Sequence, residues 1–404
     1  MNNSYEKFDV FIVGGNITGL ICAIALSQNK IKVGCCDPNI DINNFNSEDT
    51  RSTAILRSGK KFLENLNIWT NLKNSCLPLD KMEIIDDNKI FKKFSLFENY
   101  IFDSQELLEK PFGWNVKNNV LKRTLVELVK KSKNIKFFSN QSFEKLLIKE
   151  QTITINLSKE KIETNFLIGA DGLNSKVKQS IRVKQTLLDT RQKALSFQIE
   201  HEKSHKNIST EIYKEGGPLT FVPTKAKDKM NYSSVIWMNH SKESEKLYNL
   251  PKDEFEKQLN KRSLGIYGKL NLKSNINLWN VNTMFVENLC YKNVILVGEA
   301  AHVLPPIGAQ GLNTSLKDIS ILMEIFQNKN KLSYQELALK YETKRLPDIK
   351  KKIFSILLLN EVVKSNSIPI MFIRRFGIEM ISKLGFLRKK YYAIWFKLNK
   401  KKLS

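Results

Sequence analysis

The pattern of apolar and polar residues at the start of the chain predicts a strand, a tight turn and a helix in close succession. Residues 8–13 form a short, β-branched apolar run, glycines follow at once, and residues 20–26 are typical of a helix. A second apolar run over residues 31–36 ends in Asp37. Residues 8–37 therefore have the order and length of one βαβ unit with a right-handed crossover.

The pattern up to residue 170 continues to mix helices and strands. Residues 39–52 are rich in Asn and Asp, which predicts a long loop. Apolar positions recur at helical spacing over residues 53–69 and 118–131, which predicts two outer helices with basic exposed faces. Several strand-like runs lie within residues 135–170.

The pattern of helical and strand-like runs then changes twice, and this order predicts a nucleotide-binding domain that is split in sequence. Mostly strand-like runs over residues 185–290 indicate a separate antiparallel sheet, and residues 293–302 return to a buried-strand pattern. From Leu312 the chain has a helical pattern with a break at Pro347. We therefore expect the nucleotide-binding domain in residues 1–180 (with some strands of the second domain around 75–115) and 291–330, the β-sheet domain in 181–290, and a helical region in 331–404.

Composition narrows the function classes. At 404 residues the chain exceeds what one hydrophobic core usually serves. Its 42% hydrophobic and 26% charged residues are typical of a soluble globular protein, and no segment approaches the roughly 18 apolar residues of a membrane-spanning helix. The five cysteines lack metal-site spacing. We expect a cytoplasmic protein with free thiols and no metal site.

The formal net charge of +24 invites a nucleic-acid interpretation. Lysines are spread along the whole chain, however, and no nucleic-acid-binding motif accompanies them. A general bias in composition explains the charge better, so we expect no nucleic-acid partner.

The first candidate site is the turn from Gly14 to Gly19, whose sequence is GGNITG. A tight turn here brings helix N-terminal amides against a pyrophosphate, and Asp37 stands where an acid accepts hydrogen bonds from an adenosine ribose. The motif departs from the dinucleotide fingerprint at Asn16, where Gly is usual. Asn tolerates left-handed backbone, so the turn can survive. Alone, this motif separates neither FAD from NAD nor a binding site from a plain glycine turn.

Two later segments add to this site. Asp171-Gly172 follows a predicted strand, and Gly298-Glu299 leads to the sequence PPIGAQGLN at residues 305–313. The strand-end carboxylate can accept hydrogen bonds from ribityl hydroxyls, and the helix that opens after the prolines directs its first amides toward a ligand. Those amides would stabilise negative charge on a reduced flavin. An ordinary strand-to-helix turn is the alternative.

Together the three segments resemble the flavin motifs of the aromatic-ring flavoprotein monooxygenase superfamily, and PPIGAQGLN is most similar to the ubiquinone-biosynthesis hydroxylases. The resemblance implies an α/β fold with a Rossmann-like FAD-binding domain of the glutathione-reductase type, an inserted, mainly antiparallel β-sheet substrate domain and a helical C-terminus. The chain departs from the family at Glu299, where Asp is usual, and at Lys178, where Arg is common.

The resemblance also implies which residues form the site. Arg51 and Arg123 match flavin-side positions, although each could be a solvated charge, and His302 is as consistent with a structural role as with a catalytic one. Pro305 and Gly308 are the candidates for the catalytic flavin-face loop. The expected FAD-binding residues are Gly14, Gly15, Asn16, Thr18, Gly19, Asp37, Arg51, Arg123, Asp171, Gly172, Gly298, Glu299, Gly308, Gln310, Gly311, Leu312 and Asn313.

The activity implied is a single-component hydroxylation that uses NAD(P)H and O2 through a flavin hydroperoxide. The leading hypothesis for the substrate is a polyprenylated phenol in ubiquinone biosynthesis. A different soluble aromatic substrate and an FAD-binding scaffold subunit with weak catalysis are the alternatives. Basic residues beside aromatics near the C-terminus, among them Arg388, Tyr392, Phe396 and Lys400, suit peripheral contact with the inner membrane surface and association with other biosynthetic proteins, or simply a packed helical end.

Overall fold

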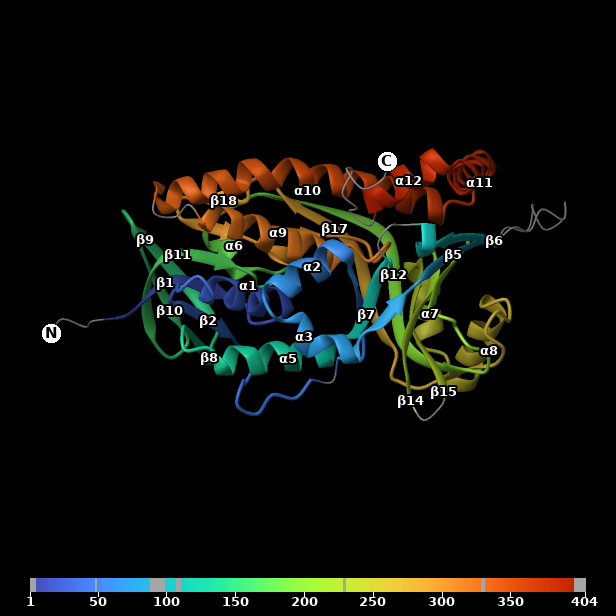
Figure 1. Cartoon of the computed structure of the whole chain (residues 1–404), viewed down its shortest axis with the longest axis horizontal. Coiled ribbons are helices and arrows are strands. Elements are labelled where there is room, and N and C mark those ends of the chain that lie inside the picture. The colour runs from blue at the N-terminus through green and yellow to red at the C-terminus, as the bar shows by residue number, and fades with distance from the viewer. Residues whose placement is uncertain are drawn as a thin grey trace.

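A mixed sheet with parallel central strands and a larger, mainly antiparallel sheet stand side by side in the molecule, with a helical layer along one side (Figure 1). The structure is a computed structural model, and it describes residues 5–47, 49–87, 99–106, 110–227, 230–327 and 331–395. Phe396 and Lys400 lie outside the described residues.

The first sheet contains the strands of the predicted nucleotide-binding domain. Its order is β18-β19-β11-β1-β2-β8, and β1 pairs in parallel with both β11 and β2. Helices cover both faces, which explains the nearly continuous apolar runs of these strands. The strands are β1 Glu6–Val13, β2 Val33–Asp37, β8 Ile135–Ser139, β9 Phe143–Lys149, β10 Thr152–Leu157, β11 Lys161–Gly169, β18 Cys290–Tyr291 and β19 Val294–Leu296. The helices around them are α1 Ile17–Ser27, α5 Asn118–Lys131, α6 Lys176–Ser180, η3 Gly298–Ala300 and α9 Gln310–Phe326.

The second sheet is mainly antiparallel and follows the order β20-β17-β12-β15-β14-β13-β5-β6. Helices α7 and α8 pack against this sheet, and the ring of Phe255 in α8 contacts that of Phe197 in β12. The strands are β5 Lys81–Asp86, β6 Asn99–Asp103, β12 Gln185–His201, β13 Ile208–Tyr213, β14 Leu219–Lys227, β15 Met230–His240, β16 Leu270–Leu272, β17 Asn277–Val286 and β20 His302–Val303, and the helices are η2 Ser104–Glu106, α7 Ser241–Tyr248 and α8 Lys252–Arg262.

A small sheet, β3-β7-β4, lies between the two large ones. Its strands are β3 Ser52–Leu56, β4 Leu77–Leu79 and β7 Gly113–Lys117, followed or flanked by α2 Arg57–Asn65, α3 Trp69–Leu72 and η1 Lys73–Ser75. The prediction of one helix over residues 53–69 was therefore partly wrong. The first residues of that span are paired with β7, because tertiary strand pairing outweighs a helical apolar spacing.

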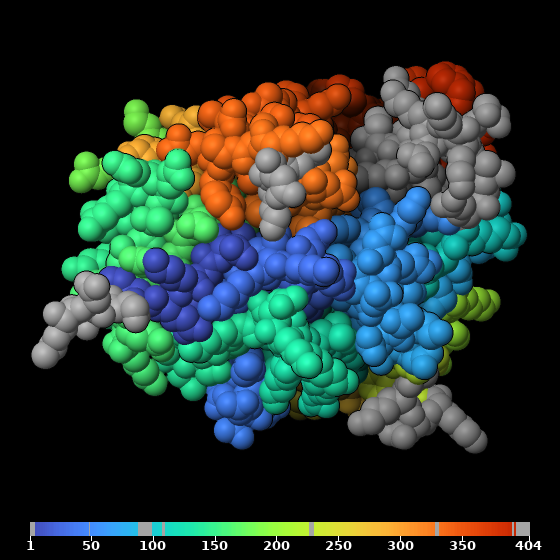
Figure 2. Space-filling view, turned by 60° about the vertical axis from the view of Figure 1, so that its left-hand side comes forward, coloured from blue at the N-terminus to red at the C-terminus, as the bar shows by residue number. Residues whose placement is uncertain are grey.

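The C-terminal layer consists of α10 Tyr334–Lys364, α11 Ile368–Lys383 and α12 Gly385–Trp395. In Figure 1 α10 runs along the top of both sheets, and Figure 2 shows its orange surface across the top of the molecule. Within the described residues no single helix is long and apolar enough to cross a bilayer; α10 and α11 meet that criterion only as a pair bent by 116°.

The predicted break at Pro347 does not occur, because Pro347 lies inside α10. A proline removes one helical hydrogen bond and strains the preceding turn. Buried residues before and after it, Tyr341 and Ile349 among them, hold both halves against the same core, and this packing outweighs the local cost.

The predicted fold class is confirmed. One boundary is less clean than expected, since β20 follows the return to the nucleotide-binding part and yet pairs with β17 of the second sheet.

Candidate active site

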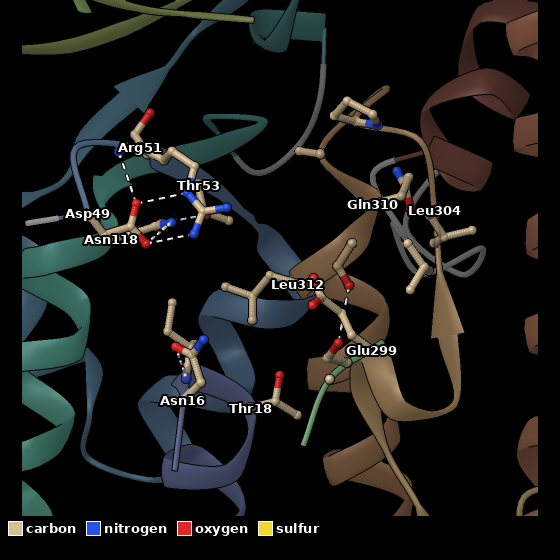
Figure 3. Close-up of a pocket in the computed structure, with 18 of the residues that line it drawn as sticks. Asn16, Thr18, Asp49, Arg51, Thr53, Asn118, Glu299, Leu304, Gln310 and Leu312 are labelled. Atoms are coloured by element: carbon tan, nitrogen blue, oxygen red, sulfur yellow. Dashed lines mark hydrogen bonds and ion pairs between the residues drawn. The ribbon is translucent and has the colours of Figure 1, made fainter. Parts of the chain in front are cut away.

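A cavity of about 790 Å³ lies where the two large sheets meet, and all three predicted motifs reach it. Figure 3 shows Asn16 and Thr18 of the first motif and Glu299, Gln310 and Leu312 of the third. This volume is in the range of sites that hold cofactors or drug-sized ligands. The predicted site residues that line it are Gly14, Asn16, Thr18, Asp37, Arg51, Asp171, Gly172, Glu299, Pro305, Gly308, Gln310, Gly311 and Leu312.

The first turn is held by close backbone contacts. Gly14 has a φ of +105°, and a Cβ at Gly19 would lie 1.8 Å from the Gly14 carbonyl oxygen. The Gly15 amide donates to Asp37 Oδ2 at 2.7 Å, so Asp37 fixes the turn while also lining the cavity. Gly15 and Gly19 do not line the cavity themselves: Gly19 lets α1 approach the end of β1, and Gly15 leaves room for Phe137 of β8 and for Asp37.

Asn16 lies at the beginning of α1 and points its side chain back onto the helix. Its backbone is extended, with a φ of −78°, so the expected left-handed geometry is absent. Its Oδ1 accepts a hydrogen bond from the Ile17 amide at 2.8 Å. The side chain thus caps an amide that would otherwise be available to a phosphate oxygen.

Asp171 follows β11 and has one carboxylate oxygen in need of a donor. Its Oδ2 accepts from the Val177 amide at 3.2 Å, whereas Oδ1 is buried with no hydrogen-bond partner among the residues that the structure describes. Burial raises the pKa of this carboxyl group. Gly172 beside it has a φ of +79° and open space where a Cβ would stand. A ligand hydroxyl would satisfy Oδ1.

A buried ion cluster supports the third motif from behind. Asp318 of α9 accepts hydrogen bonds from the Gly298 amide at 3.0 Å, from His302 Nε2 at 2.7 Å and from Arg345 of α10. Although burial alone would raise the pKa of Asp318, His302 and Arg345 lower it. His302 is therefore a structural partner of Asp318, as one of the two sequence interpretations held. Glu299 is exposed to the cavity.

The N-terminus of α9 opens onto the cavity. Gly311 lines it, and a Cβ at this position would meet nothing within 4 Å, so the backbone is open to a ligand. The positive end of the helix dipole therefore faces the cavity. Asn313, predicted to bind the cofactor, instead connects α9 to β3: it accepts from the Leu56 amide at 2.9 Å and donates to the Ala54 carbonyl at 2.8 Å.

The cavity's basic rim is assembled around Asp49. Arg51 donates to both carboxylate oxygens at 2.8 Å, and Lys122 donates to Oδ2 at 3.1 Å. Burial acts to raise the pKa of Asp49, but these two cations hold it well below its usual range. The guanidinium of Arg51 also lies 5.7 Å from the ring centre of Trp279.

The predicted residue Arg123 does not belong to this rim. It is exposed on α5 and does not line the cavity, whereas its neighbour Lys122 does. Sequence reasoning missed Lys122 and Asp49, because no motif marks them. A second cavity of about 630 Å³ shares Asp49, Arg51 and Lys122 with the first.

The wall opposite the nucleotide-binding loops is formed by the second sheet and mixes apolar with polar side chains. Met82, Val222 and Ile236 line it together with Ser209, Thr220 and Asn280, and Phe112, just before β7, lies beside them. Glu211 of β13 is the only acid among the described lining residues of this sheet, and it was not among the predicted residues. An acid on the buried face of a strand is unusual, and the sequence shows it. Alternation along the strand does not show, however, that this face lines a cavity.

These features fit FAD. The α9 amides and the open backbone of Gly172 and Gly311 can approach an anionic or polar ligand, and Asp171 Oδ1 can accept from a hydroxyl group. Asn16 is the one feature that limits the fit, because it occupies the Ile17 amide.

Comparisons with known proteins agree with this site. Residues 7–353 match a family described as FAD binding domain. The chain is 24% identical to ubiquinone hydroxylase UbiL of Rhodospirillum rubrum over 95% of this chain and 88% of that protein. It is 21% identical to 3-demethoxyubiquinol 3-hydroxylase of Escherichia coli over 95% and 97% of the two chains.

Solved structures show the same fold. The p-nitrophenol 4-monooxygenase PnpA of Pseudomonas putida superposes with a TM-score of 0.77 at 15% identity over 98% of both chains. PqsL of Pseudomonas aeruginosa, in complex with 2-aminobenzoylacetate, gives a TM-score of 0.76 at 15% identity over 89% of this chain and 97% of that one.

Proposed function

The chain belongs to the FAD binding domain family, and from that premise we propose that it is an FAD-dependent monooxygenase that hydroxylates the ring of a polyprenylated phenol in ubiquinone biosynthesis. The observation that carries the proposal is one cavity that the FAD-side loops share with a wall of the second sheet, in which Met82, Val222 and Ile236 are apolar. An aromatic ring held against that wall lies in the same space as the cofactor-binding residues.

FAD held by the loops at Gly14, Asp171 and Gly311 would be reduced by NAD(P)H and would activate O2, so that one oxygen atom would pass to the ring and the other would leave as water. The residues of the chain have two further roles. The amides at the start of α9 stabilise negative charge on a reduced cofactor, and the apolar side chains of Met82, Phe112 and Ile236 keep water from the reacting atoms.

The choice of substrate rests on two supports. Relatives that match nearly the whole chain are named ubiquinone hydroxylases. The wall formed by Phe112, Val222 and Ile236 also suits a ring with an apolar substituent. A water-soluble aromatic compound is the nearest competing substrate, and the FAD-binding scaffold is the competing role.

The test uses the purified holoprotein with NAD(P)H, isotopically labelled O2 and a short-chain prenylphenol. We expect NAD(P)H oxidation and a product that carries one labelled oxygen atom, detected by mass spectrometry. Expression in bacteria that lack a ubiquinone hydroxylase should also remove the quinone intermediate that accumulates there. Bound FAD without NAD(P)H oxidation by any prenylphenol would instead support the scaffold role, and turnover of soluble phenols alone would support the other substrate class.

Peripheral membrane contact is a further part of the proposal, supported by an exposed apolar patch on the C-terminal layer. We define the patch as Phe354 and Leu358 of α10, Ile373 and Phe376 of α11, and Phe386 of α12. Each of these side chains is between 57% and 69% exposed, and they lie on consecutive helices, of which α11 contacts both α10 and α12.

Charge and position favour an anionic bilayer as the partner of this patch. Residues 350–395 contain ten basic and two acidic residues, so the segment that carries the patch has a positive net charge. The inner side of the layer reaches the cavity wall: the ring of Tyr392 in α12 lies 5.3 Å from that of Phe112, which lines the cavity. A prenylated substrate would therefore have a short path from bilayer to cavity.

Vesicle sedimentation checks this contact. The protein should bind vesicles of phosphatidylglycerol and phosphatidylcholine, bind pure phosphatidylcholine less, and lose about tenfold or more in affinity in the triple variant Ile373→Ser, Phe376→Ser, Phe386→Ser. The double variant Leu147→Ser, Leu187→Ser removes exposed apolar side chains elsewhere and serves as the control. Equal binding by both variants would contradict a bilayer contact through the patch.

A further inference from the structure

The second sheet contributes a buried acid to the cavity wall that the cofactor site does not use. Glu211 lies in the middle of β13, paired with Ile84 of β5 and Thr220 of β14. Its side chain is buried, and it lines the cavity. Among the described lining residues from the second sheet it is the only acid. Asp171 and Glu299, in contrast, belong to the cofactor side.

The surroundings of Glu211 leave its charge largely uncompensated. The Tyr213 hydroxyl donates to Oε2 at 3.0 Å, and no ion pair to Glu211 occurs within the described parts of the chain. Burial raises the pKa of its carboxyl group, and the bond from Tyr213 opposes that rise only in part. A buried acid without a cation is costly, so a neutral residue would serve the fold better at this position.

The same surroundings suit a ligand that brings a hydrogen-bond donor. Tyr213 engages one carboxylate oxygen and leaves the other to the cavity. Met82, Val222 and Ile236 line the cavity around it, and an apolar ring fits beside them. A hydrogen bond to a buried carboxylate is stronger than one in water.

We infer that Glu211 binds the phenolic hydroxyl of the aromatic substrate and so sets which end of the ring enters the cavity. This inference rests on the proposed function. A phenol that donates to a carboxylate has a more electron-rich ring, which favours attack on an electrophilic oxygen atom. A ring without the hydroxyl leaves Glu211 unpaired, and the site rejects it for that reason.

The experiment compares a short-chain prenylphenol with its methyl ether, which keeps the shape of the ring but cannot donate. Affinity is read from the change in flavin fluorescence of the holoprotein, so no turnover is needed. The wild-type protein should bind the phenol roughly 10- to 100-fold more tightly than the ether. In Glu211→Leu this preference should disappear, and in Glu211→Gln it should fall to a few-fold.

The control is Glu200→Gln, which removes an acid on β12 of the same sheet that pairs with Lys273 and does not line the cavity. Its preference for the phenol should equal that of the wild type. FAD content of each variant reports on folding, and Glu211→Gln preserves the shape of the side chain if Glu211→Leu folds poorly.

The outcomes separate this inference from the proposed function. A wild-type protein without preference for the phenol, or an undiminished preference in the Glu211 variants, overturns the role of Glu211 even if hydroxylation is observed. A preference that depends on Glu211 in a protein that hydroxylates no phenol overturns the proposed function and leaves the binding role standing. In an active enzyme, Glu211→Gln should also raise the fraction of NAD(P)H oxidised without hydroxylated product.

Discussion

At the scale of single residues, Asn16 shows how one side chain changes a site that is otherwise intact. The glycines around it bring β1 and α1 together as the turn requires. The side chain of Asn16, however, accepts from the Ile17 amide, one of the groups that could bind a phosphate. We therefore expect a local competition to limit cofactor affinity while the fold stays unchanged.

Asn16→Gly should strengthen FAD binding by several-fold, because it releases the Ile17 amide and removes a side chain from the approach to the phosphates. The helix cap loses only a few tenths of a kcal/mol, since glycine is an acceptable cap. Titration of the apoprotein with FAD measures the effect, and Asn29→Gly, at the far end of α1, is the control. Weaker binding by Asn16→Gly would show that the amide side chain itself holds the cofactor.

The limits of sequence reasoning at this scale are visible at two positions. The choice between Lys122 and Arg123 depends on a rotation of one residue around α5, which an apolar pattern does not fix when both positions are basic. Glu211 was not predicted, because its contact with the cavity depends on how its strand packs in the folded chain. Gly14, Asp171 and Gly311 were found because their motifs describe backbone geometry that is local in sequence.

At the scale of elements, α10 differs most from its prediction. Helical periodicity located it, but Pro347 led to a break that the structure lacks. Arg345, two residues earlier, is fully buried and paired with Asp318 of α9, so tertiary contacts hold the helix on both sides of the proline. A pattern along one segment cannot reveal such a partner.

Pro347→Ala should stabilise the protein by about 1–3 kcal/mol, because alanine restores a helical hydrogen bond on an exposed face of α10. Urea unfolding of the holoprotein gives the change in free energy of unfolding. Lys340→Ala, an exposed position in the same helix, should change it by about 0.5 kcal/mol at most. A destabilised Pro347→Ala would mean that the packing of α10 requires the proline.

At the scale of the whole molecule, the order of helical and strand patterns predicted an α/β domain split around a β-sheet domain, and the fold has this form. It did not predict that β20 joins the second sheet or that β3, β4 and β7 form a sheet of their own. β7 joins β3 and β4 from well before it in the chain, β20 has only two residues, and such short strands carry too little pattern to specify their partners.

Removal of FAD should lower the stability of both large sheets together, because the cavity is lined by residues from each. FAD added back at a concentration 100 times its dissociation constant should contribute about 2.7 kcal/mol. Scanning calorimetry of apoprotein and holoprotein tests this, with the fluorescence of Trp237 and Trp279 reporting on the second sheet. If FAD left the melting temperature of the second sheet unchanged, this would contradict a site that both sheets share.

The order of strands in the first sheet has a consequence for biosynthesis of the chain. β1 is among the first segments to leave the ribosome, yet its neighbour β11 ends at residue 169, and β19 on the far side of β11 ends at residue 296. Until β11 is made, one edge of β1 has no partner, and from then until β19 is made the open edge is that of β11, so an apolar strand edge is open to aggregation throughout. Nascent chains stalled before β19 should therefore depend on chaperones, whereas chains released after α9 has emerged should need them far less.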